Sequence, residues 1–441
     1  MKADAVLGSV RSAPAFIAAT AAYLALAFCL GGASQGNAAF DLALELAAVP
    51  LLGWALFRLA GGGRLSWSAA LLPALLLIPP ALQLIPLPYG LWAALPGRET
   101  LAADLAAAGL PPTWRPLSLT PAATMDALRG LIPFTAVFLA GLAVPPQARS
   151  RLWAFTGLLA LASVALGALQ VAAGPAGGFH LYGADGRAAS GAFANRNHWA
   201  AWLAASMPIL AWRLARQIER RGATPPLATA LLGAAFLALL AGVAISGSRA
   251  GVVLAALGIF GSVVLLWRSG RSARLLVPGV IALAAGLITI AGAWAAASRF
   301  GAAADDLRFD IWRDAFGLAR DHLPFGAGGG SFSAVYAGQE NPDRMTAAFV
   351  NQAHNDWIEI FVEYGVLALA PIAAAGTIIL RGVGRAGSAG RFVLLALAVL
   401  LAASVVDYPL RTPALQVLVA LLLATLADGR DGCRRLSLGG S

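Results

Sequence analysis

Charged residues are scarce in this sequence: they make up 12% of its 441 residues, whereas 59% are hydrophobic and the mean hydropathy is +0.76. Ordinary soluble domains carry about 25% charged residues, so this composition excludes that class of protein. The sequence therefore predicts an all-α polytopic membrane protein.

Cysteine is almost absent, and so are the motifs of nucleotide and metal sites. Of the two cysteines, Cys29 lies inside the first hydrophobic run and Cys433 in the hydrophilic tail, which predicts that they do not pair. The segments expected outside lack His-x-x-x-His and Asp-x-Asp spacings, and no Walker or dinucleotide motif occurs. Gly326–Gly330 follow no strand, so we expect a tight turn or the close approach of a ligand there. We expect neither a metal nor a cofactor.

Hydrophobic runs of the length needed to cross a bilayer, roughly 17 to 25 residues, recur along the chain. The twelve predicted spans are 13–32, 38–60, 65–85, 126–144, 152–172, 195–214, 227–245, 250–267, 275–297, 356–380, 392–408 and 409–427. The first resembles the core of a signal peptide, but it has no clear cleavage pattern and is long enough to span. Pro409 and Pro413 break the last runs, so the final helix is short unless it is kinked.

The basic excess, a formal net charge of +10, is typical of nucleic-acid binding or of a membrane protein with basic cytoplasmic loops. The distribution favours the membrane, because arginine gathers in alternate connections: Arg58, Arg64, Arg149, Arg151, Arg213, Arg216, Arg220, Arg221, Arg268, Arg271, Arg274, Arg381, Arg385 and Arg391. We therefore predict no nucleic-acid partner and place both termini in the cytoplasm.

Three connections on the opposite side are too long to be simple turns, namely 86–125, 173–194 and 298–355. The first carries Trp92 and Trp114, which favours a segment at the membrane interface. The third begins with apolar residues at helical spacing, which predict an amphipathic helix: Leu307, Ile311, Ala315 and Leu318.

Three arginines fall on this outer side, against the charge bias. Arg249 lies in a short gap between two apolar runs, where the alternative is an interfacial anchor. Arg196 precedes Asn197 and His198, which could instead cap a helix. Arg308 lies on the amphipathic helix, where ion pairs offer a structural alternative. Together they indicate an anionic lipid ligand, either a lipid-linked diphosphate or a phospholipid headgroup.

His354 is one of four histidines and begins the run His354-Asn-Asp-Trp357 at the outer start of a predicted span. Its ordinary pKa is near neutral, which suits a side chain that takes a proton from a hydroxyl. Asp356 or Glu359 is expected to orient the ring, although Asp356 could equally offset the helix dipole. A structural role for His354 is the alternative.

With these motifs in order, the chain resembles the bacterial O-antigen ligase and O-antigen polymerase family. The matching segments are Gly191-Ala-Phe-Ala-Asn-Arg-Asn-His198, Ser246-Gly-Ser-Arg-Ala-Gly251, Arg308 with Trp312, Pro324-Phe-Gly-Ala-Gly328 with Phe332, and His354-Asn-Asp-Trp357 with Glu363-Tyr-Gly365. The resemblance divides the chain into an N-terminal transmembrane region 1–189, a ligase-like core 190–370 with its periplasmic loop 298–355, and C-terminal helices with a cytoplasmic tail 371–441.

The resemblance implies a GT-C-like fold of about twelve transmembrane helices with a large late periplasmic loop, in the bacterial inner membrane. It implies transfer of a glycan from undecaprenyl diphosphate to a hydroxyl of a glycan or lipid A core acceptor, with inversion and without metal. Arg249 and Arg308 would hold the diphosphate with help from Arg196, and His354 would be the general base. The supporting positions are Asn197, His198, Asn355 and Asp356. Some ligases carry two adjacent histidines here, whereas this chain has Ala353 before His354.

Two other functions remain open from the sequence. A transporter predicts ionisable residues near the bilayer midplane, and Asp41 with Glu45, one turn apart in the second span, is such a pair. The alternative is that these acids neutralise a charge on a neighbouring helix. A non-catalytic lipid-binding scaffold is the remaining alternative.

Overall fold

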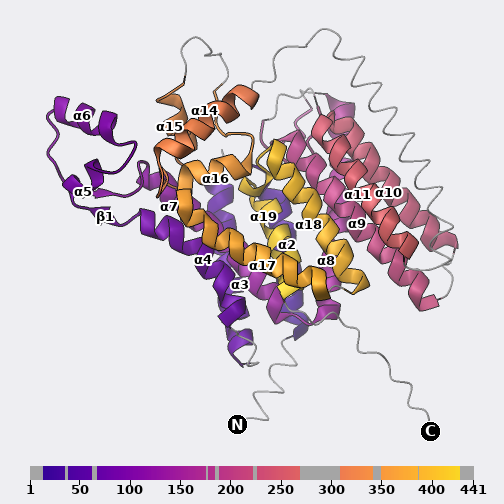
Figure 1. Ribbon diagram of the computed structural model, residues 1–441. Helices are drawn as coiled ribbons and strands as arrows, with labels where there is room; N and C mark the ends of the chain where they lie inside the picture. Colours follow the sequence, from indigo (N-terminus) through magenta and orange to yellow (C-terminus); the bar gives the residue numbers. More distant parts are fainter. Residues whose placement is uncertain are drawn as a thin grey trace.

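The computed structural model describes residues 13–34, 38–61, 67–174, 177–183, 188–221, 226–268, 308–340, 349–385 and 387–427. Long helices lie side by side in one bundle, with smaller helices above it (Figure 1). They are α2 (Ala13–Leu30), α3 (Ala38–Gly61), α4 (Trp67–Gln83), α7 (Pro121–Ala143), α8 (Pro146–Ala173), α9 (Arg196–Arg221), α10 (Pro226–Ser246), α11 (Arg249–Arg268), α17 (Leu369–Arg385), α18 (Ser388–Val406) and α19 (Pro413–Ala427).

The described helices confirm the prediction of an all-α polytopic membrane protein. Seven described helical segments are long and apolar enough to cross a membrane, and three shorter apolar helices accompany them. Ten of the predicted spans each coincide with one described helix, the tenth, 356–380, is divided between two, and the ninth, 275–297, lies outside the described residues. Cys433 also lies outside them, whereas Cys29 is free and exposed.

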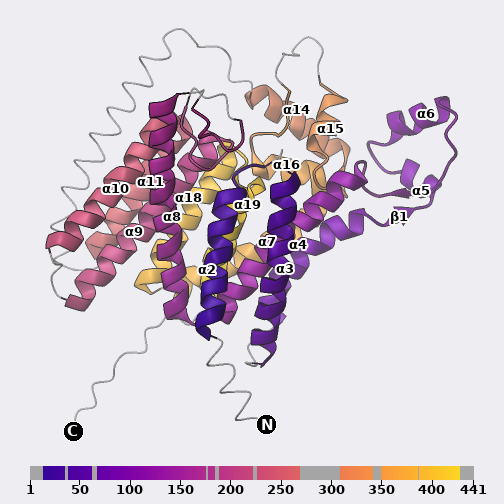
Figure 2. The ribbon, with the colours of Figure 1, turned by 180° about the vertical axis from the view of Figure 1, so that it is seen from behind.

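The core of the bundle surrounds α19, whose residues from Ala414 to Leu426 are nearly all buried. Small residues let helices approach it closely: a Cβ on Gly141 of α7 would lie 2.7 Å from the Cβ of Ala424. Aromatic rings join other helices, since Phe28 of α2 stacks on Trp202 of α9 at 4.2 Å between ring centroids. Seen from behind, α2 lies beside α3 and α8 (Figure 2).

The tenth predicted span, 356–380, lies within Asp356–Arg385, a segment long and apolar enough to cross a membrane, but it is not one continuous α-helix. The chain forms α16 (Asp356–Tyr364), a 3₁₀ turn η2 (Gly365–Ala368) and then α17. Gly365 makes the break with a φ of 53°, and a Cβ there would lie 2.2 Å from the Pro324 carbonyl oxygen. The break therefore lies where an outer loop packs against the bundle.

The smaller helices and loops lie at one end of the bundle, which we call the upper end. Residues 86–125 hold α5 (Tyr89–Ala93), α6 (Glu99–Ala107) and an antiparallel pair β1 (Pro86–Leu87) and β2 (Arg115–Pro116). The predicted amphipathic helix is confirmed as α14 (Arg308–Asp321), which buries Ile311, Ala315 and Leu318. These pack with α15 (Phe332–Ala337) and α16 in a second, smaller core. We call 308–340 the cap.

The glycine run after α14 turns tightly, as the sequence predicted. Gly326, Gly328 and Gly330 all have positive φ, and a Cβ on Gly326 would lie 2.2 Å from the Glu363 carbonyl oxygen. Gln83, at the end of α4, fastens this loop: its Nε2 donates to the Phe325 and Glu363 carbonyl oxygens at 2.9 and 2.7 Å. Its Oε1 accepts from the Gly329 N–H at 2.9 Å.

Candidate functional site

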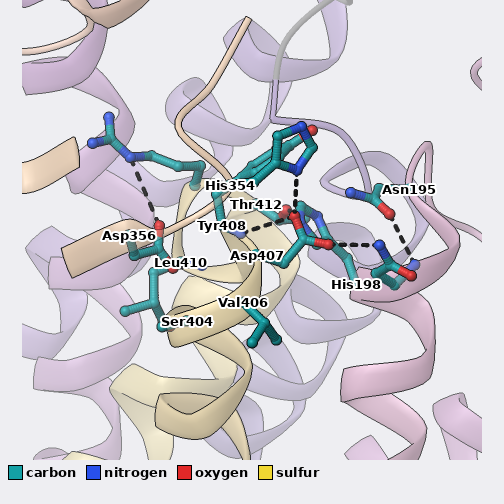
Figure 3. Close-up of polar contacts among 12 residues, drawn as sticks. Asn195, His198, His354, Asp356, Ser404, Val406, Asp407, Tyr408, Leu410 and Thr412 are labelled. Carbon is teal, nitrogen blue, oxygen red and sulfur yellow. Dashed lines mark hydrogen bonds and ion pairs between the residues drawn. The ribbon is translucent and has the colours of Figure 1, made fainter. Parts of the chain in front are cut away.

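The site lies at the upper end, where α9, α11 and α16 begin and α18 ends. The segment 407–412 between α18 and α19 contains a 3₁₀ turn, η3 (Pro409–Arg411), and passes close to the start of α16 (Figure 3). The proline break expected near the last span is thus confirmed, and it creates a polar turn between two apolar helices.

His354 occupies a special backbone position just before α16. Its φ of 51° makes it the single non-glycine residue of positive φ among the described residues. The His354 Nδ1 lies 3.2 Å from the Asp407 Oδ1, and the side chain remains 29% exposed. Because a carboxylate accepts at Nδ1, it favours the tautomer whose Nε2 lone pair is free. The exposed ring therefore has the arrangement of a proton acceptor.

Asp407 is the centre of the polar network. It is 3% exposed and accepts a hydrogen bond from the Asn197 Nδ2 at 2.7 Å, in addition to the contact with His354. The His198 Nε2 lies 3.8 Å from its Oδ1. Burial raises the pKa of Asp407, but the interactions with the nearby His198 and His354 side chains outweigh burial and hold the pKa below its ordinary value. The carboxylate therefore stays ionised at neutral pH.

Two further side chains, those of His198 and Tyr408, lie beside the His354–Asp407 pair. His198 is 1% exposed, and its Nδ1 shares a 2.7 Å hydrogen bond with the Thr412 hydroxyl. The Tyr408 ring meets both imidazoles edge to face, at 4.7 Å from His198 and 5.0 Å from His354. Burial, and then the charge of Asp407, raise the pKa of Tyr408 to about 12. A buried histidine of this kind supports the fold of the site, whereas His354 faces outward.

The three predicted arginines lie around this network. The Arg308 Nη1 donates to the Val406 carbonyl oxygen at 3.0 Å, next to Asp407. Arg249 is exposed at the first residue of α11, and the preceding Ser248 donates from its hydroxyl to the Asn197 Oδ1 at 2.7 Å. Arg196 is exposed at the first residue of α9. Arg308 thus contacts the residue before Asp407, Arg249 follows a serine that contacts Asn197, and Arg196 directly precedes Asn197 in the chain.

A second charged cluster lies on the other side of the same segment. The Arg411 guanidinium approaches three carboxylates of α16, those of Glu363 at 2.7 Å, Glu359 at 3.4 Å and Asp356 at 3.9 Å. Glu359 also accepts from the Ala353 N–H at 2.8 Å, and Asp356 from the Leu410 N–H at 3.1 Å. This cluster therefore holds the backbone of the turn that carries His354.

The acid beside the His354 ring differs from the expected one. The sequence placed Asp356 or Glu359 there, but these side chains face Arg411, and Asp407 makes the contact. Asn355 caps α16, since its Oδ1 accepts from the Trp357 and Ile358 N–H groups at 2.9 and 3.1 Å. The missed signal was a carboxylate that follows nineteen mostly apolar residues of α18, where an acidic side chain is costly without a partner.

The described residues contain no group of three or more His, Cys, Asp or Glu arranged to hold a metal ion. Residues 233–373 match a family model described as O-antigen ligase, and no curated protein matches the sequence. This range includes Arg249, Arg308 and His354, while Asn197 and Asp407 lie outside it. The match confirms the resemblance read from the motifs: the chain carries a domain of the O-antigen ligase family.

Proposed function

We propose that this protein transfers a glycan from an undecaprenyl-diphosphate donor to an acceptor hydroxyl at the periplasmic face, as an O-antigen ligase or polysaccharide polymerase. The observation that carries the proposal is the His354–Asp407 pair, held at one end of a membrane bundle beside Arg308 and the start of α11. The family match supports the same class of reaction.

His354 acts as the general base. Its Nε2 takes the proton of the acceptor hydroxyl while the oxygen attacks the anomeric carbon of the donor glycan. Asp407 is a positioning residue, because it accepts at Nδ1 and stabilises the imidazolium that forms. General-base catalysis of this kind contributes a factor of about 10² to 10⁴ in rate.

The arginines act on the leaving group. The bond between the anomeric carbon and the diphosphate oxygen breaks as the new bond forms, so the configuration inverts and undecaprenyl diphosphate leaves with the charge. Arg249 and Arg308 bind that diphosphate, and Arg196 assists, because a guanidinium donates to two phosphate oxygens at once. Fixed cations at the developing charge supply the larger electrostatic part of catalysis, and in this proposal no metal takes that role.

The direction of the bundle supports a periplasmic site. Ala13 and Ala427, the first and last described residues, lie at the end opposite His354, since Gly31 and Ala414 meet at the upper end through a 3.0 Å hydrogen bond. The lower end carries basic residues at helix ends, such as Arg268 of α11. By the positive-inside rule, that end faces the cytoplasm, and both termini with it, in a bacterial inner membrane.

The acidic pair that favoured a transporter, Asp41 with Glu45, has a structural explanation. The pair lies on α3, and the Glu45 carboxylate is 3.3 Å from the Arg129 Nε of α7. The charge is thus shared with a neighbouring helix, as expected of a structural pair.

The test is complementation of a strain deleted for this gene with His354→Asn. Asparagine tolerates the positive φ of this position, so the variant removes the base without adding backbone strain. We expect loss of surface glycan at matched expression, whereas His180→Asn, in another loop, leaves it intact. Long lipid-linked chains would accumulate for a ligase, and single repeat units for a polymerase. Normal glycan in His354→Asn would overturn the proposal.

A further inference from the structure

A large cavity opens between the helices, and Arg196, Arg249 and Arg308 are not among its lining residues. Its volume is about 1060 Å³, and it is lined by α3, α4, α7, α16, α17, α18 and α19. This volume is as large as those of the largest common small-molecule sites, whose volumes run from roughly 300 to 1,000 Å³.

The cavity has an apolar part and a polar rim. Leu76, Phe134, Ile372, Ile379 and Leu423, which belong to membrane-spanning or apolar helices, line the apolar part. The rim lies at the upper end, where α3, α7 and α16 begin and α19 begins beside them. An apolar wall at membrane depth with a polar rim fits an amphiphile whose tail lies in the membrane.

The rim reaches the turn that carries His354 without including the arginines proposed to bind the diphosphate. Gln352 and Asp356, two residues before and after His354, both line the cavity. Arg249 and Arg308 do not line it. Its occupant would therefore reach the turn that carries the base without displacing a donor bound at Arg249 and Arg308.

The charges of the rim are acidic in excess. Asp41, Glu45 and Asp126 line it together with Arg129, whose Nε lies 3.3 Å from the Glu45 carboxylate. On the facing wall Arg411 is already shared among three carboxylates of α16. A phosphate or diphosphate at this rim would meet like charge, whereas hydroxyl groups could donate to the carboxylates.

Gln352 independently calls for a ligand group that donates a hydrogen bond. It is 5% exposed and lines the cavity, and its Oε1 has no hydrogen-bond partner among the described residues. A buried amide oxygen without a partner costs free energy, so a ligand that supplies a hydroxyl there gains that hydrogen bond.

From this geometry we infer that the cavity binds the acceptor, a lipid whose headgroup presents sugar hydroxyls and no anionic group at the rim. The tail occupies the apolar part, and the headgroup hydroxyls contact Gln352 and the rim carboxylates while one of them reaches His354. The assignment of this lipid as acceptor rests on the proposed function; the binding of a neutral glycolipid does not.

The test is photo-crosslinking to the full-length protein in nanodiscs. Two probes carry the same diazirine acyl chain, one on glucosyl diacylglycerol and one on phosphatidylglycerol. We expect the neutral glycolipid to label the peptides of α4 and α17 several-fold more than the anionic lipid does. Equal or stronger labelling by phosphatidylglycerol would overturn the inference.

Two alanines on α17 provide a matched pair of variants. Ala375 lines the cavity, whereas Ala373 is exposed on the same helix and does not line it. Ala375→Trp fills the cavity and should reduce labelling by the glycolipid several-fold, while Ala373→Trp should leave it unchanged. Equal labelling of the two variants would place the lipid elsewhere and contradict the inference.

The donor is the remaining candidate occupant. Unlabelled undecaprenyl diphosphate should not compete with the glycolipid probe, and competition at this cavity would assign it to the donor and overturn the inference. The labelling is repeated in His354→Asn, which should bind the probe as the wild type does. Failure of the proposed function appears as glycan synthesis by that variant, and failure of this inference appears in the labelling, so the two are distinguishable.

Discussion

Two charged clusters lie on opposite sides of the segment 407–411, and their compositions are reversed. Asp407 is one carboxylate that contacts the Asn197 amide and the His354 imidazole, with a second imidazole, that of His198, 3.8 Å away, and its partner His354 is partly exposed. Arg411 is one guanidinium among three carboxylates that are almost fully buried. Imidazole changes its protonation near neutral pH and guanidinium does not. The first cluster is therefore suited to proton transfer, and the second to holding the chain in place.

The largest effect is expected from Asp407→Asn. The amide can donate to the His354 Nδ1, which favours the tautomer whose Nε2 carries the proton and cannot accept one. In a comparable Asp–His arrangement such a change lowers kcat by about 10⁴. Transfer assays across a pH range should show this loss, with thermal stability close to that of the wild type.

Asp104→Asn is the matched control, because Asp104 is exposed on α6. It should transfer glycan as the wild type does. If Asp407→Asn kept wild-type activity and an unchanged pH profile, the separation of the two clusters by role would be wrong.

Next in size is the effect of Arg411→Met on stability. The substitution leaves three buried carboxylates without their cation, and breaking a buried ion pair on one side costs about 3–5 kcal/mol. Unfolding of the detergent-purified protein should shift to lower temperature. Adding Glu363→Gln to Arg411→Met should restore part of the stability, because it removes one uncompensated charge.

Arg129→Met provides the comparison, since Arg129 is 51% exposed and should change the unfolding temperature little. An Arg411→Met protein that unfolds like the wild type would show that the cluster does not hold the turn.

The arginines around the first cluster are expected to have a smaller effect on rate than Asp407. In the proposed mechanism Arg308→Ala and Arg249→Ala each remove a cation that binds the leaving group, and losses of about 10² to 10³ in kcat are typical for one such donor. Single-turnover assays with the lipid-linked donor measure this loss.

Each of these arginines has a control on its own helix. Arg313 of α14 is 69% exposed and pairs with Asp310, and Arg268 lies at the lower end of α11. Their alanine variants should stay within a few-fold of wild-type rate. Equal losses in Arg308→Ala and Arg313→Ala would point to general surface charge instead of a diphosphate site.

The smallest expected effect is that of Asn355→Ala, which removes the cap of α16. Loss of an N-cap costs roughly 0.5–2 kcal/mol. Because Asn355 also donates to the Val405 carbonyl oxygen at 2.9 Å, the variant loosens the join between the two clusters. Hydrogen exchange of the α16 amides should rise, and a change confined to distant helices would contradict this role.

The bundle was readable from the sequence because a membrane helix leaves a long apolar run, and Leu-rich and Ala-rich runs matched eleven described helices. Hydropathy also marked 356–380 as a span, but it does not register the break at Gly365, where the backbone packs closely against Pro324.

The site was readable only in part. Arg249, Arg308 and His354 stand out as polar residues beside apolar runs, and the structure brings their surroundings together. Asp407 was missed because it is 53 residues from His354 in sequence, and nearness along the chain pointed to Asp356 instead. The positive φ at His354 separates its backbone conformation from that of α16, and no local pattern encodes it.

The three hydrogen bonds of Gln83 hold the cap in place, and under the proposed function this affects how a long glycan approaches the bundle. One amide joins the end of α4, the loop of the cap and the end of α16, so lifting the cap from α16 breaks these bonds together. The cap is thus fixed to the bundle and does not move as a hinged lid. Under the proposed function, a glycan of many sugar units would therefore enter beside the cap and not through an opening of the cap.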